Sequence, residues 1–250
     1  MSTGIPGQHD SHGVLPDHRR DDAPVAAVLF DWDGTLVDSL PLVTEATNRV
    51  LVAHGFSALS ADAVHDGMRL PTVPRMILHA RLPEDERSQT LAERMAADFY
   101  RTAARIGHDR VSPFPGVTEL LDRLSARGIP MAIVSNNRRS VLEPLIDRLG
   151  LHSHFACIIG EEDVTLPKPD PEGILRSLEH LGVAIARAIY VGDSQSDAGA
   201  AAAAGLRSVG AGWAVPARSR SVLDAFDVTC MSAADLAMRF GGADRSGGRV

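Results

Sequence analysis

The chain has 250 residues, of which 44% are hydrophobic and 23% charged, as expected for a globular protein of one large or two modest domains. Its formal net charge of −7 and its lack of basic runs argue against nucleic acid as the main partner. No apolar stretch reaches the ~18 residues of a membrane span, so no membrane association is expected.

The first segment, residues 1–22, is rich in Gly, His, Asp and Pro and lacks hydrophobic periodicity, which predicts a disordered tail. It also lacks a basic region followed by an apolar core, so we expect no secretory signal and a cytoplasmic protein. Residues 241–250 predict a second disordered tail.

A short apolar run at residues 25–30 predicts a first buried strand. The following interval, residues 38–112, contains helical patterns only, at residues 42–54, 61–68, 74–80 and 84–106. A single crossover does not need so much chain. The interval therefore predicts an all-helical cap domain inserted into a core made of residues 23–37 and 113–240.

In the rest of the core, further apolar runs alternate with amphipathic helices. The predicted strands are residues 131–134, 156–159 and 188–191, and the predicted helices are residues 117–127, 140–149 and 171–181. This alternation predicts an α/β fold with a doubly wound, Rossmann-like parallel sheet.

Two carboxylates, Asp31 and Asp33, directly follow the first predicted strand, and Gly34 and Thr35 come next. Side chains at i and i+2 of extended chain share a direction, so both carboxylates can project from the strand's carboxyl end. That edge is where open α/β sheets bind ligands. Two carboxylates so close favour a divalent cation or a shared proton.

Polar groups follow the second predicted strand as well, in the run Ser135-Asn136-Asn137. A hydroxyl and backbone N–H groups at such a turn can hold phosphate oxygens, although Ser and Asn are also common loop residues. Lys168, the only lysine among 25 Lys and Arg, stands between Pro167 and Pro169 in a segment that cannot be helical. A cation there suits neutralisation of a phosphoryl group.

After the last predicted strand come Asp193 and Asp197. Ser194 and Asp197 have the spacing of a helix capping box, which accounts for Asp197 but not for Asp193. Asp31, Asp33 and Asp193 together supply the oxygen ligands that Mg²⁺ prefers. All these groups follow parallel strands and should meet at one sheet edge.

The ordered segments DWDGTL, VSNN, LPKPDP and GDSQSDAGAAAAAG resemble the four motifs of the haloacid dehalogenase-like hydrolase superfamily. The resemblance covers about residues 24–240 and is to members with a helical cap, such as phosphoglycolate phosphatases and beta-phosphoglucomutases. It implies that Asp31 is a nucleophile that forms an aspartyl-phosphate and that Asp33 is the general acid and base. Lys168 would neutralise the charge of the nucleophile and the phosphoryl group.

The resemblance also implies a Mg²⁺ cofactor and a set of phosphate contacts. The implied metal site comprises Asp31, the Asp33 carbonyl and Asp193, with Asp197 in the outer shell. The expected phosphate or substrate contacts are Thr35, Ser135, Asn136 and the cap residue Arg69, with Arg75 as a further cap candidate.

These inferences predict a Mg²⁺-dependent phosphatase that hydrolyses a small phosphorylated metabolite. The alternatives are a beta-phosphoglucomutase-like phosphotransferase, whose motifs are the same, and a non-catalytic, receiver-like phosphate-binding module. The cap interval contains no lysine, which eliminates family members that use a cap Schiff base. The sequence does not indicate an oligomeric state.

Overall fold

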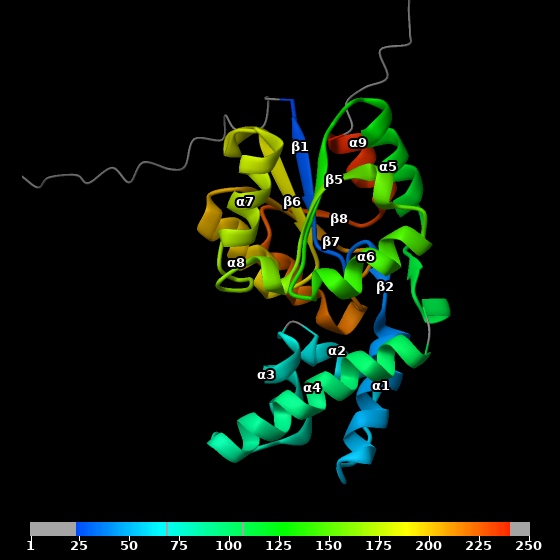
Figure 1. The fold of residues 1–250 in the computed structure, drawn as a ribbon. Coiled ribbons are helices and arrows are strands. Elements are labelled where there is room, and N and C mark those ends of the chain that lie inside the picture. Colours follow the sequence, from blue (N-terminus) through cyan, green and yellow to red (C-terminus); the bar gives the residue numbers. More distant parts are fainter. Residues whose placement is uncertain (1–23, 69, 107, 241–250) are drawn as a thin grey trace, which may run out of the picture.

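The computed structural model describes residues 24–240 apart from residues 69 and 107. Both predicted tails and the candidate contact Arg69 therefore lie outside the described residues. Figure 1 shows an α/β unit above and a helical unit, α1 to α4, below it. None of the described helices is both long and apolar enough to cross a membrane.

A six-stranded sheet with the order β5-β4-β1-β6-β7-β8 forms the centre of the α/β unit. Every strand pairs with its neighbours in parallel, which confirms the predicted fold class. The strands are β1 (Ala27–Phe30), β4 (Met131–Val134), β5 (Phe155–Ile159), β6 (Ala188–Gly192), β7 (Arg207–Ala211) and β8 (Val228–Cys230).

The last two strands, β7 and β8, were not predicted. β7 has a single β-branched residue, Val209, and β8 has only three residues, so neither gives a recognisable apolar run. Both are added to the sheet by pairing with the strand before them and by burial, which no local pattern records.

Helices cover both faces of the sheet (Figure 1). On one face lie α7 (Glu172–Leu181) and α8 (Gln195–Ala204), and on the other lie α5 (Val117–Ala126), α6 (Arg139–Arg148) and α9 (Ala233–Phe240). Successive residues of β1 alternate between the two: Ala27 and Leu29 pack on the α7 and α8 side, Val28 and Phe30 on the other. By the same alternation, Asp31 continues the row that faces α7 and α8.

The helical unit comprises α1 (Leu40–Ala53), α2 (Ala61–Gly67), α3 (Thr72–Ala80) and α4 (Glu86–Ile106). The chain enters and leaves the helical unit through two antiparallel strands, β2 (Val37–Asp38) and β3 (Ser112–Pro113). The predicted insert, residues 38–112, begins and ends inside this pair, whose strands were not predicted because each has two residues. The hydrogen-bonded pair fixes where the helical unit is attached.

Close packing of α2 on α3 depends on Gly67. A Cβ atom there would lie 2.4 Å from Cε1 of His79, so any larger residue would require the buried ring to move. His79 is buried, and its Nε2 has no hydrogen-bond partner among the described residues. Burial, with a smaller contribution from the charge of Arg75, lowers the pKa of His79 to about 4.

We predict that His79 makes the protein less stable in mild acid. In the unfolded chain His79 takes up its proton near pH 6.5, but the folded protein resists protonation down to about pH 4. The unfolded state therefore binds more protons in this window, and the free energy of unfolding falls as the pH falls, by up to about 3 kcal/mol.

The measurement is urea unfolding between pH 7 and pH 4 for the wild type and for His79→Gln, which stays neutral. The pH slope should be smaller in His79→Gln, while loss of the exposed His180 in His180→Gln should leave the slope as in the wild type. Equal slopes in wild type and His79→Gln would show that the ring accepts a proton without cost.

Candidate active site

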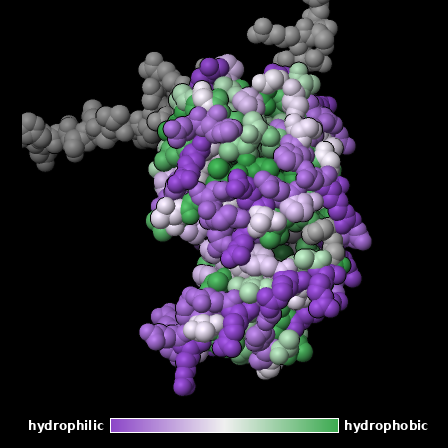
Figure 2. Space-filling view, in the orientation of Figure 1, coloured by the Kyte–Doolittle hydropathy of each residue, from purple (hydrophilic) through white to green (hydrophobic). Residues whose placement is uncertain are grey.

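A cavity of about 70 Å³ lies at the carboxyl ends of β1, β4 and β6, between the sheet and the helical unit. Figure 2 shows the surface hollowed between these two parts of the molecule. The residues that line the cavity come from both parts. They are Asp31, Asp33, Ser135, Asn136, Asn137, Lys168, Asp193, Ser194 and Ser196 on the sheet side, and Val43, Met68, Leu70, Thr72, Arg75 and Phe99 on the helical side.

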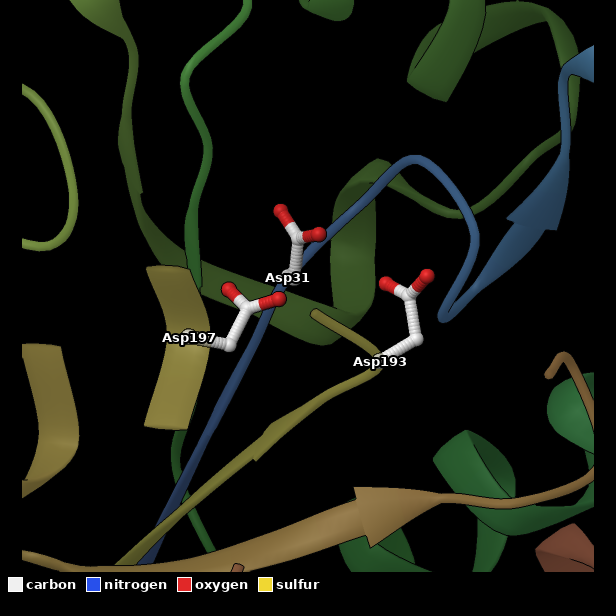
Figure 3. Close-up of side chains that lie close together, drawn as sticks. All are labelled: Asp31, Asp193 and Asp197. Atoms are coloured by element: carbon white, nitrogen blue, oxygen red, sulfur yellow. The ribbon is translucent and has the colours of Figure 1, made fainter. Parts of the chain in front are cut away.

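Three carboxylates, Asp31, Asp193 and Asp197, point toward one another at this edge (Figure 3). One oxygen atom of each lies within 4.8 Å of the others. Burial, reinforced by the charge of Asp197, raises the pKa of Asp31 to about 7, although Lys168 opposes the shift. Burial and the charges of Asp197 and Asp31 raise the pKa of Asp193 well above its usual range. The cluster therefore holds more negative charge than the described residues neutralise.

Lys168 is buried among acceptors that match its three N–H groups. Its Nζ lies 2.7 Å from Oδ1 of Asp31, 2.7 Å from Oδ1 of Asp197 and 3.0 Å from Oη of Tyr190. Burial alone would lower the pKa of Lys168, but the charges of Asp197 and Asp31 outweigh it and raise the pKa above the usual value. A compact ammonium satisfies this arrangement, whereas a planar guanidinium is larger and presents its donors in one plane.

The loop that carries Lys168 is fixed by Asn136. The Asn136 Nδ2 donates to the main-chain oxygen of Lys168 at 3.0 Å, and the Lys168 N–H donates to Oδ1 of Asn136 at 2.8 Å. Asn136 lines the cavity, as a phosphate contact would, but both polar atoms of its side chain are occupied by this loop. In this structure the Asn136 side chain holds the main chain of Lys168 in position.

Asp33 is held by a residue that the sequence analysis did not single out. The Asn137 Nδ2 donates to Oδ2 of Asp33 at 3.1 Å, and the Asn137 N–H donates to Oγ of Ser135 at 3.1 Å. Tyr190 was missed as well, because it lies inside an apolar strand and has the pattern of a core residue. The contact of Asn137 with Asp33 spans 104 residues and that of Tyr190 with Lys168 spans 22, so no local signal indicates either of them.

Thr35 lies away from the cavity, in contrast to its expected phosphate contact. Its side chain is fully buried, and its hydroxyl donates to Oδ1 of Asp193 at 3.0 Å. The preceding Gly34 has φ +80°, and a Cβ atom there would lie 2.6 Å from Oδ2 of Asp193. This turn therefore orients Asp193 and leaves room for its carboxylate.

The three clustered carboxylates suit a divalent cation, but they are not equally free to bind one. Both oxygens of Asp197 already accept hydrogen bonds: Oδ1 from Lys168 and Tyr190, and Oδ2 from the N–H and Oγ of Ser194. The latter contacts form the predicted capping box of α8. Among the described residues, no donor reaches Oδ2 of Asp31 or Oδ2 of Asp193. From the residues that the structure describes, Asp31 and Asp193 each accept a single hydrogen bond, at Oδ1, so both carboxylates, unlike that of Asp197, keep lone pairs with which they can serve as hard ligands.

Comparisons with known protein families and with curated proteins identify relatives of one kind. A family model described as haloacid dehalogenase-like hydrolase matches residues 28–211. A phosphoglycolate phosphatase of Pseudomonas putida is 34% identical over 185 residues, covering 73% of this chain and 68% of that protein. A phosphoglycolate phosphatase of Pseudomonas savastanoi pv. phaseolicola is 35% identical over 184 residues, covering 73% and 67%.

Solved structures share the fold. A HAD-superfamily hydrolase of subfamily IA from Geobacter sulfurreducens PCA has a TM-score of 0.59 and 29% identity, covering 74% of this chain and 89% of that one. A beta-phosphoglucomutase of Clostridium difficile has a TM-score of 0.69 at 18% identity, covering 85% and 93%. The second likeness shows the fold alone.

We predict that a divalent cation stabilises the folded protein through Asp31 and Asp193. Mg²⁺ at about 100 times its dissociation constant should add about 2.7 kcal/mol to the free energy of unfolding, because it binds only the folded chain. For a chain of this size that is a rise of roughly 5–11 °C in Tm.

The measurement is thermal unfolding with and without Mg²⁺. The rise should disappear in Asp193→Asn and persist in Asp224→Asn, which changes an exposed aspartate elsewhere. A full rise in Asp193→Asn would place the cation at another site.

Proposed function

Because this chain belongs to the haloacid dehalogenase-like hydrolase family and is a phosphatase of that family, we propose that it hydrolyses a small phosphate monoester through an aspartyl-phosphate at Asp31. The main support for the proposal is the hydrogen bonding of the two Asp31 carboxylate oxygens. Its Oδ1 is held 2.7 Å from Lys168 Nζ, while no described donor reaches its Oδ2. One oxygen is thus fixed and the other is available to attack phosphorus.

In the first step, Oδ2 of Asp31 forms a bond to phosphorus as the bond from phosphorus to the ester oxygen breaks. The departing oxygen takes a proton from Asp33. In the second step, Asp33 removes a proton from a water molecule, which attacks the phosphoryl group and releases inorganic phosphate and Asp31. Asn137 supports both steps because its hydrogen bond fixes the Asp33 carboxylate.

Lys168 and Ser135 complete the phosphoryl site. The ammonium of Lys168 is itself buried and offsets negative charge on Asp31 and on the phosphoryl oxygens. Ser135 lines the cavity and offers its hydroxyl to a phosphoryl oxygen. Asn136 acts on the same site through the Lys168 loop that it holds.

The cofactor that we propose is Mg²⁺, held by Asp31, Asp193 and the main-chain carbonyl of Asp33. When bound, it neutralises the carboxylates and withdraws charge from the phosphoryl oxygens. Asp197 would stay in the outer shell, since its oxygens are occupied by Lys168, Tyr190 and Ser194. Thr35 would keep Asp193 oriented toward the ion.

We propose a small substrate because the relatives are named for phosphoglycolate and the cavity at Asp31 measures about 70 Å³. A second cavity of about 540 Å³ shares Asp33, Met68, Asp193 and Ser194 with it. Curated relatives are phosphoglycolate phosphatases, which makes phosphoglycolate the first substrate to assay. Closure of the helical unit over the leaving group would exclude bulk water.

We predict that Asp31→Asn abolishes phosphate release, by about a thousandfold or more, because an amide cannot carry the phosphoryl group. The measurement is release of inorganic phosphate from phosphoglycolate with Mg²⁺, before and after chelation with EDTA, which should also stop turnover. Phosphate release that persists in Asp31→Asn would contradict the nucleophile. Isomerised sugar phosphate without free phosphate would point to phosphotransfer instead.

We predict that Lys168→Arg keeps the protein folded but lowers kcat by about 100-fold, because the guanidinium does not fit the three acceptors around Nζ. Tyr190→Phe removes the third acceptor of Lys168 and a donor to Asp197 but leaves the ammonium and its two carboxylate partners in place, so it should cost less. Thermal unfolding serves as the folding control for both variants. Near-normal turnover of Lys168→Arg would show that any cation suffices at this position.

A further inference from the structure

Arg75 on α3 is a buried cation that the reaction above does not use. Its side chain is 7% exposed, and its Cζ lies 4.8 Å from the centre of the Phe99 ring. Within the described part of the chain, no hydrogen bond or ion pair reaches its guanidinium, and its Nε is buried without a partner. Buried arginines are normally paired with an anion, because removing the charge from water is costly.

The guanidinium lines the same cavity as Asp31, Asp33 and Lys168, but from the opposite wall. Most of the other side chains on that wall are apolar, namely Val43, Met68, Leu70 and Phe99. The exception is Thr72, whose hydroxyl lies 2.7 Å from Oη of Tyr100 and is engaged there. Among the described residues of the helical wall, Arg75 is thus the one charged group.

The nearby cation Arg138 does not serve the same purpose. Its side chain is 55% exposed, its Nε lies 3.6 Å from Oε2 of Glu161, and its Cζ stacks 4.8 Å from the Tyr100 ring centre. Arg138 already has an anionic partner and is in contact with solvent. The charges of Asp33 and Glu161 act on Arg75 from a distance, but among the described residues no carboxylate is in hydrogen-bond or ion-pair contact with it. A molecule that enters the cavity can supply an anion in direct contact.

We propose that Arg75 binds a carboxylate of the substrate and thereby selects small phosphorylated carboxylic acids. This inference rests on the proposed phosphatase function, which places the phosphoryl group at Asp31 on the facing wall. The two parallel N–H groups of a guanidinium match the two oxygens of a carboxylate. A second phosphate is a poorer match, because it brings up to two charges into a cavity to which the described residues of the helical wall supply one cation, Arg75.

The contacts of Arg75 also explain how it could hold such a group in place. The Phe99 ring supports the guanidinium from one side by a cation–π contact, which limits its conformations before substrate binds. A substrate held between Arg75 and Lys168 has its two anionic ends on opposite walls. The carboxylate then fixes the direction in which the ester bond points, and the substrate length is restricted to a few atoms.

The test compares two substrates that differ in one group: phosphoglycolate, and ethylene glycol monophosphate, in which a neutral hydroxyl group replaces the carboxylate. The wild type should prefer phosphoglycolate. In Arg75→Gln, kcat/KM for phosphoglycolate should fall by about 100-fold, mainly through KM, and the preference between the two substrates should fall by about tenfold or more. Arg75→Lys should restore part of that preference.

Arg94→Gln provides the matched control, because it removes an exposed arginine from the same helical unit. It should leave the preference as in the wild type. An equal loss on both substrates in Arg75→Gln would show a structural role for Arg75 and overturn the inference. So would a wild type that hydrolyses ethylene glycol monophosphate as well as phosphoglycolate, although the phosphatase function would then stand. Phosphate release from neither substrate, nor from a general aryl phosphate, would overturn the phosphatase function itself.

Discussion

The buried ammonium of Lys168 is the interaction on which the candidate site depends. Three carboxylates gathered in one buried place repel one another, and burial alone already disfavours their charged forms. Lys168 offsets part of this cost because it contacts Asp31 and Asp197 at the same time, while the hydroxyl oxygen of Tyr190 accepts its third hydrogen bond. The remaining negative charge is what makes the site receptive to a divalent cation.

The residues around Lys168 form a second layer that holds the reacting groups still. Asn136 fixes the backbone on which Lys168 stands, Asn137 fixes Asp33, and Thr35 fixes Asp193. All three come from turns that directly follow central strands of the sheet, so their backbone positions are set by strand pairing. Such support keeps reacting groups in place without reorganisation during the reaction. The described side chains of the helical unit that face this edge are mostly apolar, and Arg75 is the one charged residue among them.

Much of the fold could be predicted because short apolar runs and helical periodicity in the sequence indicate most of its strands and helices. The apolar runs before Asp31 and Ser135 correspond to β1 and β4, and the helical patterns correspond to α1 to α4 within about two residues at each end. Four strands could not be predicted: β2, β3 and β8, which have two or three residues each, and β7, which has five residues but a single β-branched one. Their residues become strands only because a partner strand lies alongside, which a two- or five-residue window does not show.

The sequence by itself determined which chemical groups are present and where the chain must turn: a single lysine beside prolines, a glycine after Asp33, and aspartates that follow apolar strands. Only the tertiary structure decided how those groups are paired. It brought Lys168 to Asp31 across 137 residues, assigned Thr35 to Asp193 and Asn136 to the Lys168 loop, and left Arg75 buried without a hydrogen-bond partner among residues that the structure describes. The physical reason is that charge pairing and burial depend on distances between segments far apart in the chain, and packing alone sets those distances.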